Sequence, residues 1–337
     1  MAHPEKLKER LAPHIGKKPW VIIDEIQKVP ALLDLVHQQI EKRTFHFALS
    51  GSSARKLKRG QANLLAGRAF GFSLFPLTYR ELSSAFDLDH ALAFGTLPAV
   101  IHFREVLDKQ RFLKTYVSTY LKEEILIEQI IRNLPPFKRF LEVAAVTSGE
   151  ILNYSNIAKD ILSDPKTVSS YYTILEDTLL GFFLPAFHTS IRKQQRQAQK
   201  FYFFDLGVVR ALAQRIDAPV LPKTFEYGML FENFIMNEIH RLLTYKEKQF
   251  SLSYLRTKED VEIDLIIERA GEPTWLCEIK SAERIDERHT SSLENIGKSL
   301  PNAKKVVISL DPVAKKIGSV DILPWQEAID EIIPYGY

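Results

Sequence analysis

The stretch Trp20–Pro30, WVIIDEIQKVP, decides how we interpret the first part of the chain. Val21–Ile23 is apolar and β-branched, which predicts a fully buried strand of a parallel sheet. Asp24 and Glu25 follow at once and end the strand with two acids. Two interpretations stay open from these residues alone: an ordinary buried strand that ends in solvated acids, or a strand that delivers acids to a functional site.

The second interpretation has a definite chemistry. In a nucleotide-hydrolysing α/β domain, acids at the carboxyl end of such a strand face the phosphate site. Asp24 would hold the shell of a Mg²⁺ ion, and Glu25 would polarise the attacking water. On this interpretation the stretch is similar to a Walker B strand.

The residues that follow extend the pattern. Ala31–Ile40 has apolar side chains at helical spacing, and Phe45–Leu49 is typical of a second buried strand, which ends in Ser50–Ser53. Leu64–Leu82, LLAGRAFGFSLFPLTYREL, comes next. The motifs DEIQKVP, LSGSS, LAGR and FPLTYREL together resemble the AAA-family ATPases of bacteria and archaea that carry a C-terminal domain of unknown function with a restriction-endonuclease-like core.

This resemblance implies ATP and Mg²⁺ as the cofactors of the intact family member. It implies a small polar residue at the γ-phosphate, for which Ser52 is the candidate, and a phosphate or subunit contact for Arg68. Residues 1–85 would be the C-terminal half of an AAA-type domain, and 86–135 a helical lid or connector.

The chain departs from the family in one respect. The family begins with a strand and a phosphate-binding loop, G-x-x-x-x-G-K-[ST], whereas only 19 residues precede Trp20 and none of them forms this motif. Ile15–Lys18 and Ile296–Ser299 contain a Gly-Lys pair without the required spacing. We therefore expect a truncated family member, or one that has lost nucleotide binding, with defective ATP hydrolysis.

Composition limits the remaining possibilities. The 337 residues leave room for two or three domains, and 45% hydrophobic residues can form real cores. A net charge of +3 requires any nucleic-acid contact to come from local patches. The single cysteine, Cys277, cannot form an internal disulfide, and the sequence has no apolar run of transmembrane length. We expect a cytoplasmic protein without a membrane partner, in which an oligomer is compatible with the sequence.

Residues 136–205 have the pattern of a winged helix. Helices are expected at Phe137–Ser148, Asn153–Leu162 and Lys166–Leu180, followed by the strand-like Gly181–Ala186. Asp164 and Pro165 supply an N-cap and a first-turn proline for the third helix.

Basic residues of this region predict contacts with the phosphate backbone of DNA. Lys166 lies at the start of the third helix. The loop where a wing would be, Ile191–Lys200, contains Arg192, Lys193, Arg196 and Lys200. The alternative, a module that packs against a protein partner and whose basic loop is merely solvated, stays open.

The last region, 206–337, contains the most informative pattern. Tyr227–Tyr245 is a strongly amphipathic helix, with Glu232 close to its apolar stripe. Val261–Ile267 and Trp275–Lys280 are typical of two strands joined by a turn centred on Gly271.

A hairpin symmetric about this turn places Asp264 opposite Glu278, with Lys280 on the same face as Glu278. Two facing carboxylates repel each other in a simple sheet, and a divalent cation between them would turn repulsion into coordination. Lys280 could then position or activate the attacking water.

This arrangement resembles the core of PD-(D/E)xK nucleases. The resemblance assigns Glu278-Ile279-Lys280 to the E-x-K motif, and Glu232, Asp264 and Glu278 to a metal site. The alternative is an exposed sheet face on which the acids turn outward while Glu262 pairs with Lys280.

We therefore predict an α/β protein: a partial P-loop AAA-type domain, a helical and winged-helix middle, and a restriction-endonuclease-like C-terminal α/β domain. Its expected function is that of a truncated AAA-family ATP-binding protein with a DNA-binding winged helix and a nuclease-like domain. The alternative is a non-enzymatic regulatory or protein-interaction module whose nucleotide and metal sites are vestigial.

Overall fold

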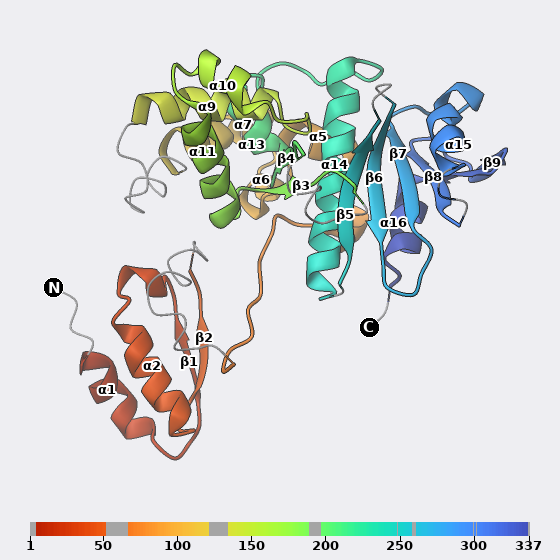
Figure 1. Cartoon of the computed structure of the whole chain (residues 1–337). Coiled ribbons are helices and arrows are strands. Elements are labelled where there is room, and N and C mark those ends of the chain that lie inside the picture. The colour runs from red at the N-terminus through yellow and green to blue at the C-terminus, as the bar shows by residue number, and fades with distance from the viewer. Residues whose placement is uncertain are drawn as a thin grey trace. The chain divides into compact units, whose positions relative to one another are not determined.

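The computed structural model describes residues 5–51, 67–120, 134–188, 197–247, 249–257, 261–298, 300 and 302–335 (Figure 1). The chain divides into two compact units. One comprises residues 1–72 and 173–180, and the other comprises 73–172 and 181–337. No helix in the described part of the chain combines the length and the apolar character that crossing a bilayer requires.

The first unit has a small parallel sheet. Its elements in chain order are α1 (Glu5–Leu11), β1 (Trp20–Ile23), α2 (Leu32–Glu41) and β2 (His46–Leu49). β1 and β2 run parallel, with Trp20 opposite His46 and Ile23 opposite Leu49. The two strands and the helix between them are confirmed, and Asp24 follows β1 as predicted.

The prediction that β1 is fully buried is wrong. Trp20 and Ile22 are 70% and 78% exposed, whereas Val21 and Ile23 are half-buried. Residues two apart share one sheet face, and in the described residues α2 packs on only one face of this two-stranded sheet. The apolar run therefore has one covered side and one side in solvent.

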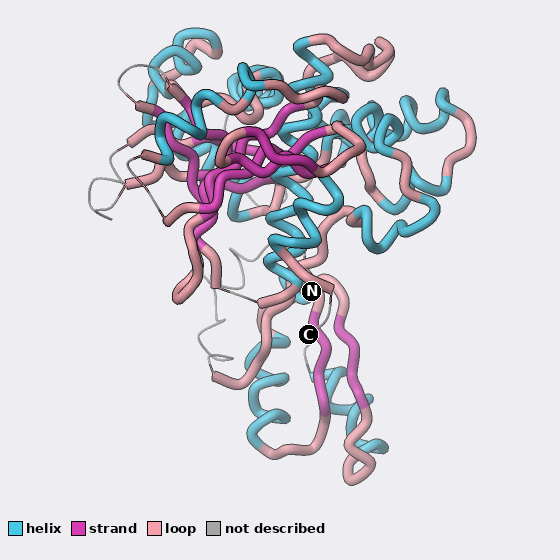
Figure 2. Tube along the Cα trace, turned by 90° about the vertical axis from the view of Figure 1, so that its right-hand side faces the viewer, coloured by secondary structure: helices cyan, strands magenta, loops and turns pink. Residues whose placement is uncertain are grey.

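The second unit is built on a mixed sheet of six strands, shown in magenta in Figure 2. Their order across the sheet is β5 (Ser251–Arg256), β6 (Glu262–Glu268), β7 (Trp275–Lys280), β8 (Lys304–Ser309), β10 (Val320–Pro324) and β9 (Lys315–Ile317). β7, β8 and β10 are parallel, and the other neighbours are antiparallel. This unit is a mixed α/β structure.

Helices cover both faces of the sheet (Figure 1). On one face, α14 (Phe225–Tyr245) and α16 (Trp325–Ile332) pack on Leu265, Cys277 and Ile279. On the other face, α15 (Ser291–Gly297) packs on Ile266, Leu276 and Val307. The alternation of side chains along β7 explains why a continuous apolar run is buried on both sides.

The segment before this sheet is helical. It contains α5 (Leu88–Phe94), α6 (Pro98–His102), α7 (Val106–Thr115), α9 (Leu134–Val146), α10 (Tyr154–Asp160), α11 (Pro165–Asp177) and α13 (Leu206–Leu212). Helix α5 ends before Gly95, which has a φ of +74°, and Pro98 begins α6. Within the helical connector expected over residues 86–135, α7 is followed by a π-helical turn, Tyr116–Tyr120.

A β-hairpin follows α11. β3 (Gly181–Leu184) pairs antiparallel with β4 (Lys200–Phe203). Beyond β3, Ala186 forms a bridge with Tyr254, which joins the hairpin to strand β5 at the edge of the main sheet. Three helices and a hairpin are the element order that the winged-helix prediction requires, and the winged helix itself stays a prediction.

The FPLTYREL motif packs within the second unit, although we expected it to close the first. Thr78 caps α4 (Tyr79–Leu82) through a capping box with Glu81. The Tyr79 backbone N–H donates to the Glu238 carboxylate on α14, and its hydroxyl donates to Asp330 on α16. These partners lie in the C-terminal helices, and the compact second unit begins at residue 73.

Candidate functional site

A charged cluster forms where strands β6 and β7 reach the end of their regular pairing. The pairing runs from Ile267 opposite Trp275 to Leu265 opposite Cys277, which is the register predicted about Gly271. Just beyond it, the Ile279 backbone N–H donates to Asp264 Oδ2 at 2.7 Å. A side-chain carboxylate therefore joins the two strands at this end.

Lys280 lies next to two buried acids. Its Nζ atom is 2.7 Å from Glu278 Oε2 and 3.6 Å from Asp264 Oδ2. The Glu278 and Asp264 side chains are 4% and 12% exposed, whereas that of Lys280 is 36% exposed. The alternative of outward-turned acids is therefore wrong, and Glu262 pairs with Lys200 instead of Lys280.

Burial dominates the electrostatics of this group. Burial and the neighbouring charge of Asp264 raise the pKa of Glu278, and Lys280 opposes the increase only in part. Burial also disfavours the charged form of Lys280, but Asp264 and Glu278 outweigh burial and raise the pKa of that ammonium group. Lys280 therefore stays cationic beside the carboxyl groups of Glu278 and Asp264.

A second set of charges lies beside the first. Lys200, the first residue of β4, has its Nζ atom 2.6 Å from Glu262 Oε1 and 3.4 Å from Glu232 Oε1. The Tyr202 hydroxyl donates to Glu232 Oε1 at 2.8 Å. Lys200 is only 5% exposed. We had grouped Lys200 with the basic loop that would contact DNA, and its burial between two acids overturns that assignment.

The structure does not bring Glu232, Asp264 and Glu278 together as a three-carboxylate ligand set. In the described ranges, no three His, Cys, Asp or Glu side chains are placed so that they could hold a metal ion. Burial and the charge of Asp264 do raise the pKa of Glu232, so the acids interact electrostatically. Asp264 and Glu278 form one group with Lys280, and Glu232 belongs to the group around Lys200.

In the first unit, Asp24 lies at the exposed end of β1. Its Oδ1 atom accepts hydrogen bonds from the Ser50 hydroxyl and from the Glu25 backbone N–H. Glu25, with a φ of +52°, accepts a hydrogen bond from Gln27 Nε2 at 2.6 Å. Ser52 lies outside the described residues. Ser50 is the polar residue beside Asp24, and its place directly after the second strand is the signal that could have identified it.

The remaining predicted residues lie apart from these groups. Arg68 forms an ion pair with Glu41 at the end of α2. Lys166 is exposed in the first turn of α11. Arg192, Lys193 and Arg196 fall outside the described residues, so their predicted contact with DNA stays a prediction.

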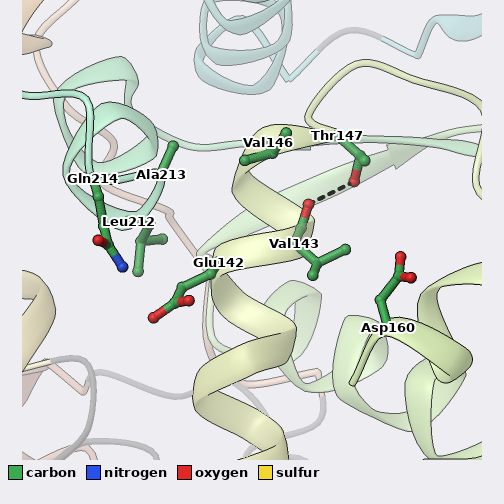
Figure 3. A pocket seen from close by; sticks show the side chains of 8 residues that line it. All are labelled: Glu142, Val143, Val146, Thr147, Asp160, Leu212, Ala213 and Gln214. Atoms are coloured by element: carbon green, nitrogen blue, oxygen red, sulfur yellow. Dashed lines mark hydrogen bonds between the residues drawn. The ribbon is translucent and has the colours of Figure 1, made fainter. Parts of the chain in front are cut away.

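A separate cavity of about 390 Å³ lies among α9, α10 and the end of α13 (Figure 3). Val143, Val146 and Leu212 contribute apolar walls, and the carboxylates of Glu142 and Asp160 lie at its sides. Both of these acidic residues are exposed to solvent. The cavity shares no residue with the charged cluster, and solvated carboxylates do not define a chemistry for it.

Three family matches cover successive parts of the chain. Residues 2–83 match the family described as AAA domain. This N-terminal part of the chain is therefore similar to an AAA domain. Residues 85–218 and 227–328 match two families described as domains of unknown function, DUF8612 and DUF4143. The site at Asp264, Glu278 and Lys280 lies within the third match, and Lys200 lies within the second.

Three curated relatives are similar to most of this chain at low identity. An uncharacterized protein of Mycobacterium bovis and one of Mycobacterium tuberculosis are each 26% identical over 260 residues, which cover 77% of this chain and 58% of the relative. An uncharacterized protein of Haemophilus influenzae is 22% identical over 321 residues, which cover 90% of this chain and 76% of the relative. The chain thus spans 58% of the length of the mycobacterial relatives.

Proposed function

We propose that the second unit carries a Mg²⁺-dependent phosphodiesterase site of the PD-(D/E)xK nuclease type, with DNA as its substrate. The observation that carries this proposal is the position of Lys280 Nζ, 2.7 Å from Glu278 and 3.6 Å from Asp264 at the partly exposed C-terminal end of β7. Buried carboxyl groups with a strongly shifted pKa beside a charged partner are typical of functional sites.

The donor atoms suit a magnesium ion. Mg²⁺ is commonly held by one or two carboxylates and keeps several water ligands, so Asp264 and Glu278 would suffice without Glu232. When bound, the ion would polarise a phosphodiester and lower the pKa of its water. The hydrogen bond from the Ile279 N–H orients the Asp264 carboxylate and supports this role.

The chain itself contributes Lys280. Its ammonium group remains charged because the neighbouring acids raise its pKa, and its partial exposure leaves donor N–H groups on the solvent side. There it would stabilise the negative charge that develops on phosphoryl oxygens. The exposed Lys166 and the order of three helices and a hairpin support a DNA-contacting role for the preceding module.

For the first unit, the AAA match and the Asp24–Ser50 contact support descent from a nucleotide-binding domain. The 337 residues contain no phosphate-binding loop motif, so we propose that this chain binds ATP weakly and hydrolyses it poorly. Titration with a fluorescent ATP analogue tests this. A Mg²⁺-dependent affinity in the micromolar range would contradict it.

A non-enzymatic interaction module is the second candidate. It is favoured by the two lysines, because Lys280 and Lys200 already neutralise both acidic groups. A titration with Mn²⁺ separates the candidates. Binding by the wild type that is lost in Asp264→Asn supports the enzyme, and no binding by the wild type supports the interaction module.

The direct test is cleavage of supercoiled plasmid DNA with Mg²⁺ or Mn²⁺. We expect nicking by the wild type and a decrease of ~10²-fold in Lys280→Ala, the size typical of losing one charge-stabilising group. Lys298→Ala, which removes an exposed lysine of the same unit, is the matched control and should cleave normally. Equal cleavage by Lys280→Ala and the wild type, or no cleavage with either metal, would overturn the proposal.

A further inference from the structure

Lys200 is a buried cation that the proposed reaction does not use. Its side chain is 5% exposed and lies within ion-pair distance of Glu262 and Glu232. Burying an ammonium group is costly unless it is well paired, so a buried lysine at this place requires a reason. An apolar residue at this position would leave the Glu232 and Glu262 carboxylates without their cationic partner.

The surroundings of Lys200 Nζ form a site for positive charge. Besides the two carboxylates, the ring of Tyr254 has its centroid 5.4 Å from Nζ. Burial acts against the charged form, but Glu232, Glu262 and Asp264 together raise the pKa of Lys200. Carboxylate oxygens such as those of Glu232 and Glu262 are also the ligand type that a hard divalent metal prefers.

From this we infer that Lys200 occupies the position of a second cation and thereby limits the cluster to one divalent metal ion, an inference that rests on the metal site proposed above at Asp264 and Glu278. The Lys280 side chain is 36% exposed, so its ammonium group can move aside when Asp264 and Glu278 bind a metal ion. The Lys200 side chain is 5% exposed, so its ammonium group remains between Glu232 and Glu262. It is a positioning residue: it holds Glu232 of α14 and Glu262 of β6 together, away from the ligand set that the sequence predicted for Glu232.

Lys200 and its acidic partners come from different parts of the chain. Its backbone is held by a β-bridge with Ile151, and the Leu152 N–H donates to the Gln199 carbonyl at 2.8 Å. These residues lie in the region that matches DUF8612, whereas Glu232 and Glu262 lie in the region that matches DUF4143. The cluster is therefore composite, with its inner cation supplied by the preceding module.

Metal stoichiometry of the full chain tests the inference, measured by calorimetric titration with Mn²⁺ and by the electron paramagnetic resonance signal of free Mn²⁺. Lys200→Met removes the charge and keeps much of the volume, and we expect it to bind one more Mn²⁺ than the wild type. Lys200→Arg keeps the charge and should match the wild type. Tyr202→Phe, the matched control, removes a hydrogen bond to Glu232 without altering the charge and should also match it.

Each outcome is decisive. Equal stoichiometry in Lys200→Met and the wild type overturns the inference, including the case in which neither binds Mn²⁺. If the wild type binds none and Lys200→Met binds one, the proposed metal site at Asp264 and Glu278 fails while the role of Lys200 stands. If Lys200→Met is unfolded without metal, Mn²⁺ should restore its circular dichroism, because the ion replaces the ammonium group. No restoration, with Lys200→Arg folded, is contrary to the inference.

Discussion

Glu238 provides a quantitative test of the buried charges in the second unit. Its carboxylate is fully buried, accepts a hydrogen bond from the Tyr79 N–H at 3.0 Å, and lies 3.2 Å from Arg241 Nη1. Replacement by glutamine keeps the size and an oxygen acceptor for the Tyr79 N–H, and removes the titrating proton. The effect of Glu238→Gln on stability should therefore depend on pH.

The magnitude follows from the pKa of Glu238. Burial raises this pKa from 4.5 to about 7, and Arg241 counteracts burial only in part. The folded protein thus keeps the proton to higher pH than the unfolded chain, so the stability from this group is complete below about pH 4.5 and is lost as pH rises through about 7. At ~1.36 kcal/mol per pH unit, the loss amounts to about 3 kcal/mol.

Urea denaturation followed by fluorescence, at four pH values between about 4.5 and 7.5, measures this loss. The unfolding free energy of the wild type minus that of Glu238→Gln should fall by about 3 kcal/mol across the range. Glu327→Gln, at an exposed position of α16, is the control and should give a difference constant to about 0.5 kcal/mol. A constant difference for Glu238→Gln as well would refute the argument that burial keeps this carboxyl protonated.

Three further predictions concern stability in urea or heat. Thr78→Ala removes the capping box of α4 and should cost about 1 kcal/mol, and an unchanged urea midpoint would contradict the role of the cap. Gly95→Ala should cost clearly more than Gly271→Ala. Both glycines have a positive φ, which costs about 1–3 kcal/mol for alanine. Only at Gly95 would the new Cβ also meet the buried Asp205 carboxylate. Equal urea midpoints for the two variants would refute this clash. Burial lowers the pKa of His240 to about 4. The stability that neutral His240 contributes is therefore present above about pH 6.5 and is lost as pH falls toward 4. Over this pH range, the melting temperature of His240→Phe should fall less than that of the wild type.

Local patterns in the sequence were sufficient for several elements. The apolar stripe of Tyr227–Tyr245 predicted α14, and the alternation around Gly271 predicted both strands and their register. Asp164 caps α11 through the Thr167 N–H, as its position before a proline indicated. Each of these features depends on residues that are near one another along the chain.

Features that depend on distant partners could not be predicted in the same way. Lys200 follows a basic loop, and only the fold shows that its partners are Glu232 and Glu262. Strand β5 was missed because it is an edge strand with a register shift between Ser253 and Leu255, which interrupts its alternation. The exposure of Trp20 and Ile22 was missed for a related reason: composition identifies a strand but not what covers it.

The packing of FPLTYREL against the C-terminal helices determines where the chain can be divided. A fragment that begins at residue 86 would lack the Tyr79 N–H that donates to Glu238 and the Arg80 guanidinium that pairs with Asp330 at 2.7 Å. Cleavage near Gly71 or Phe72, both exposed, would keep these bonds intact. Limited proteolysis should therefore yield a stable product that retains residues 73–85, and recombinant expression of the C-terminal part is best begun upstream of Leu74.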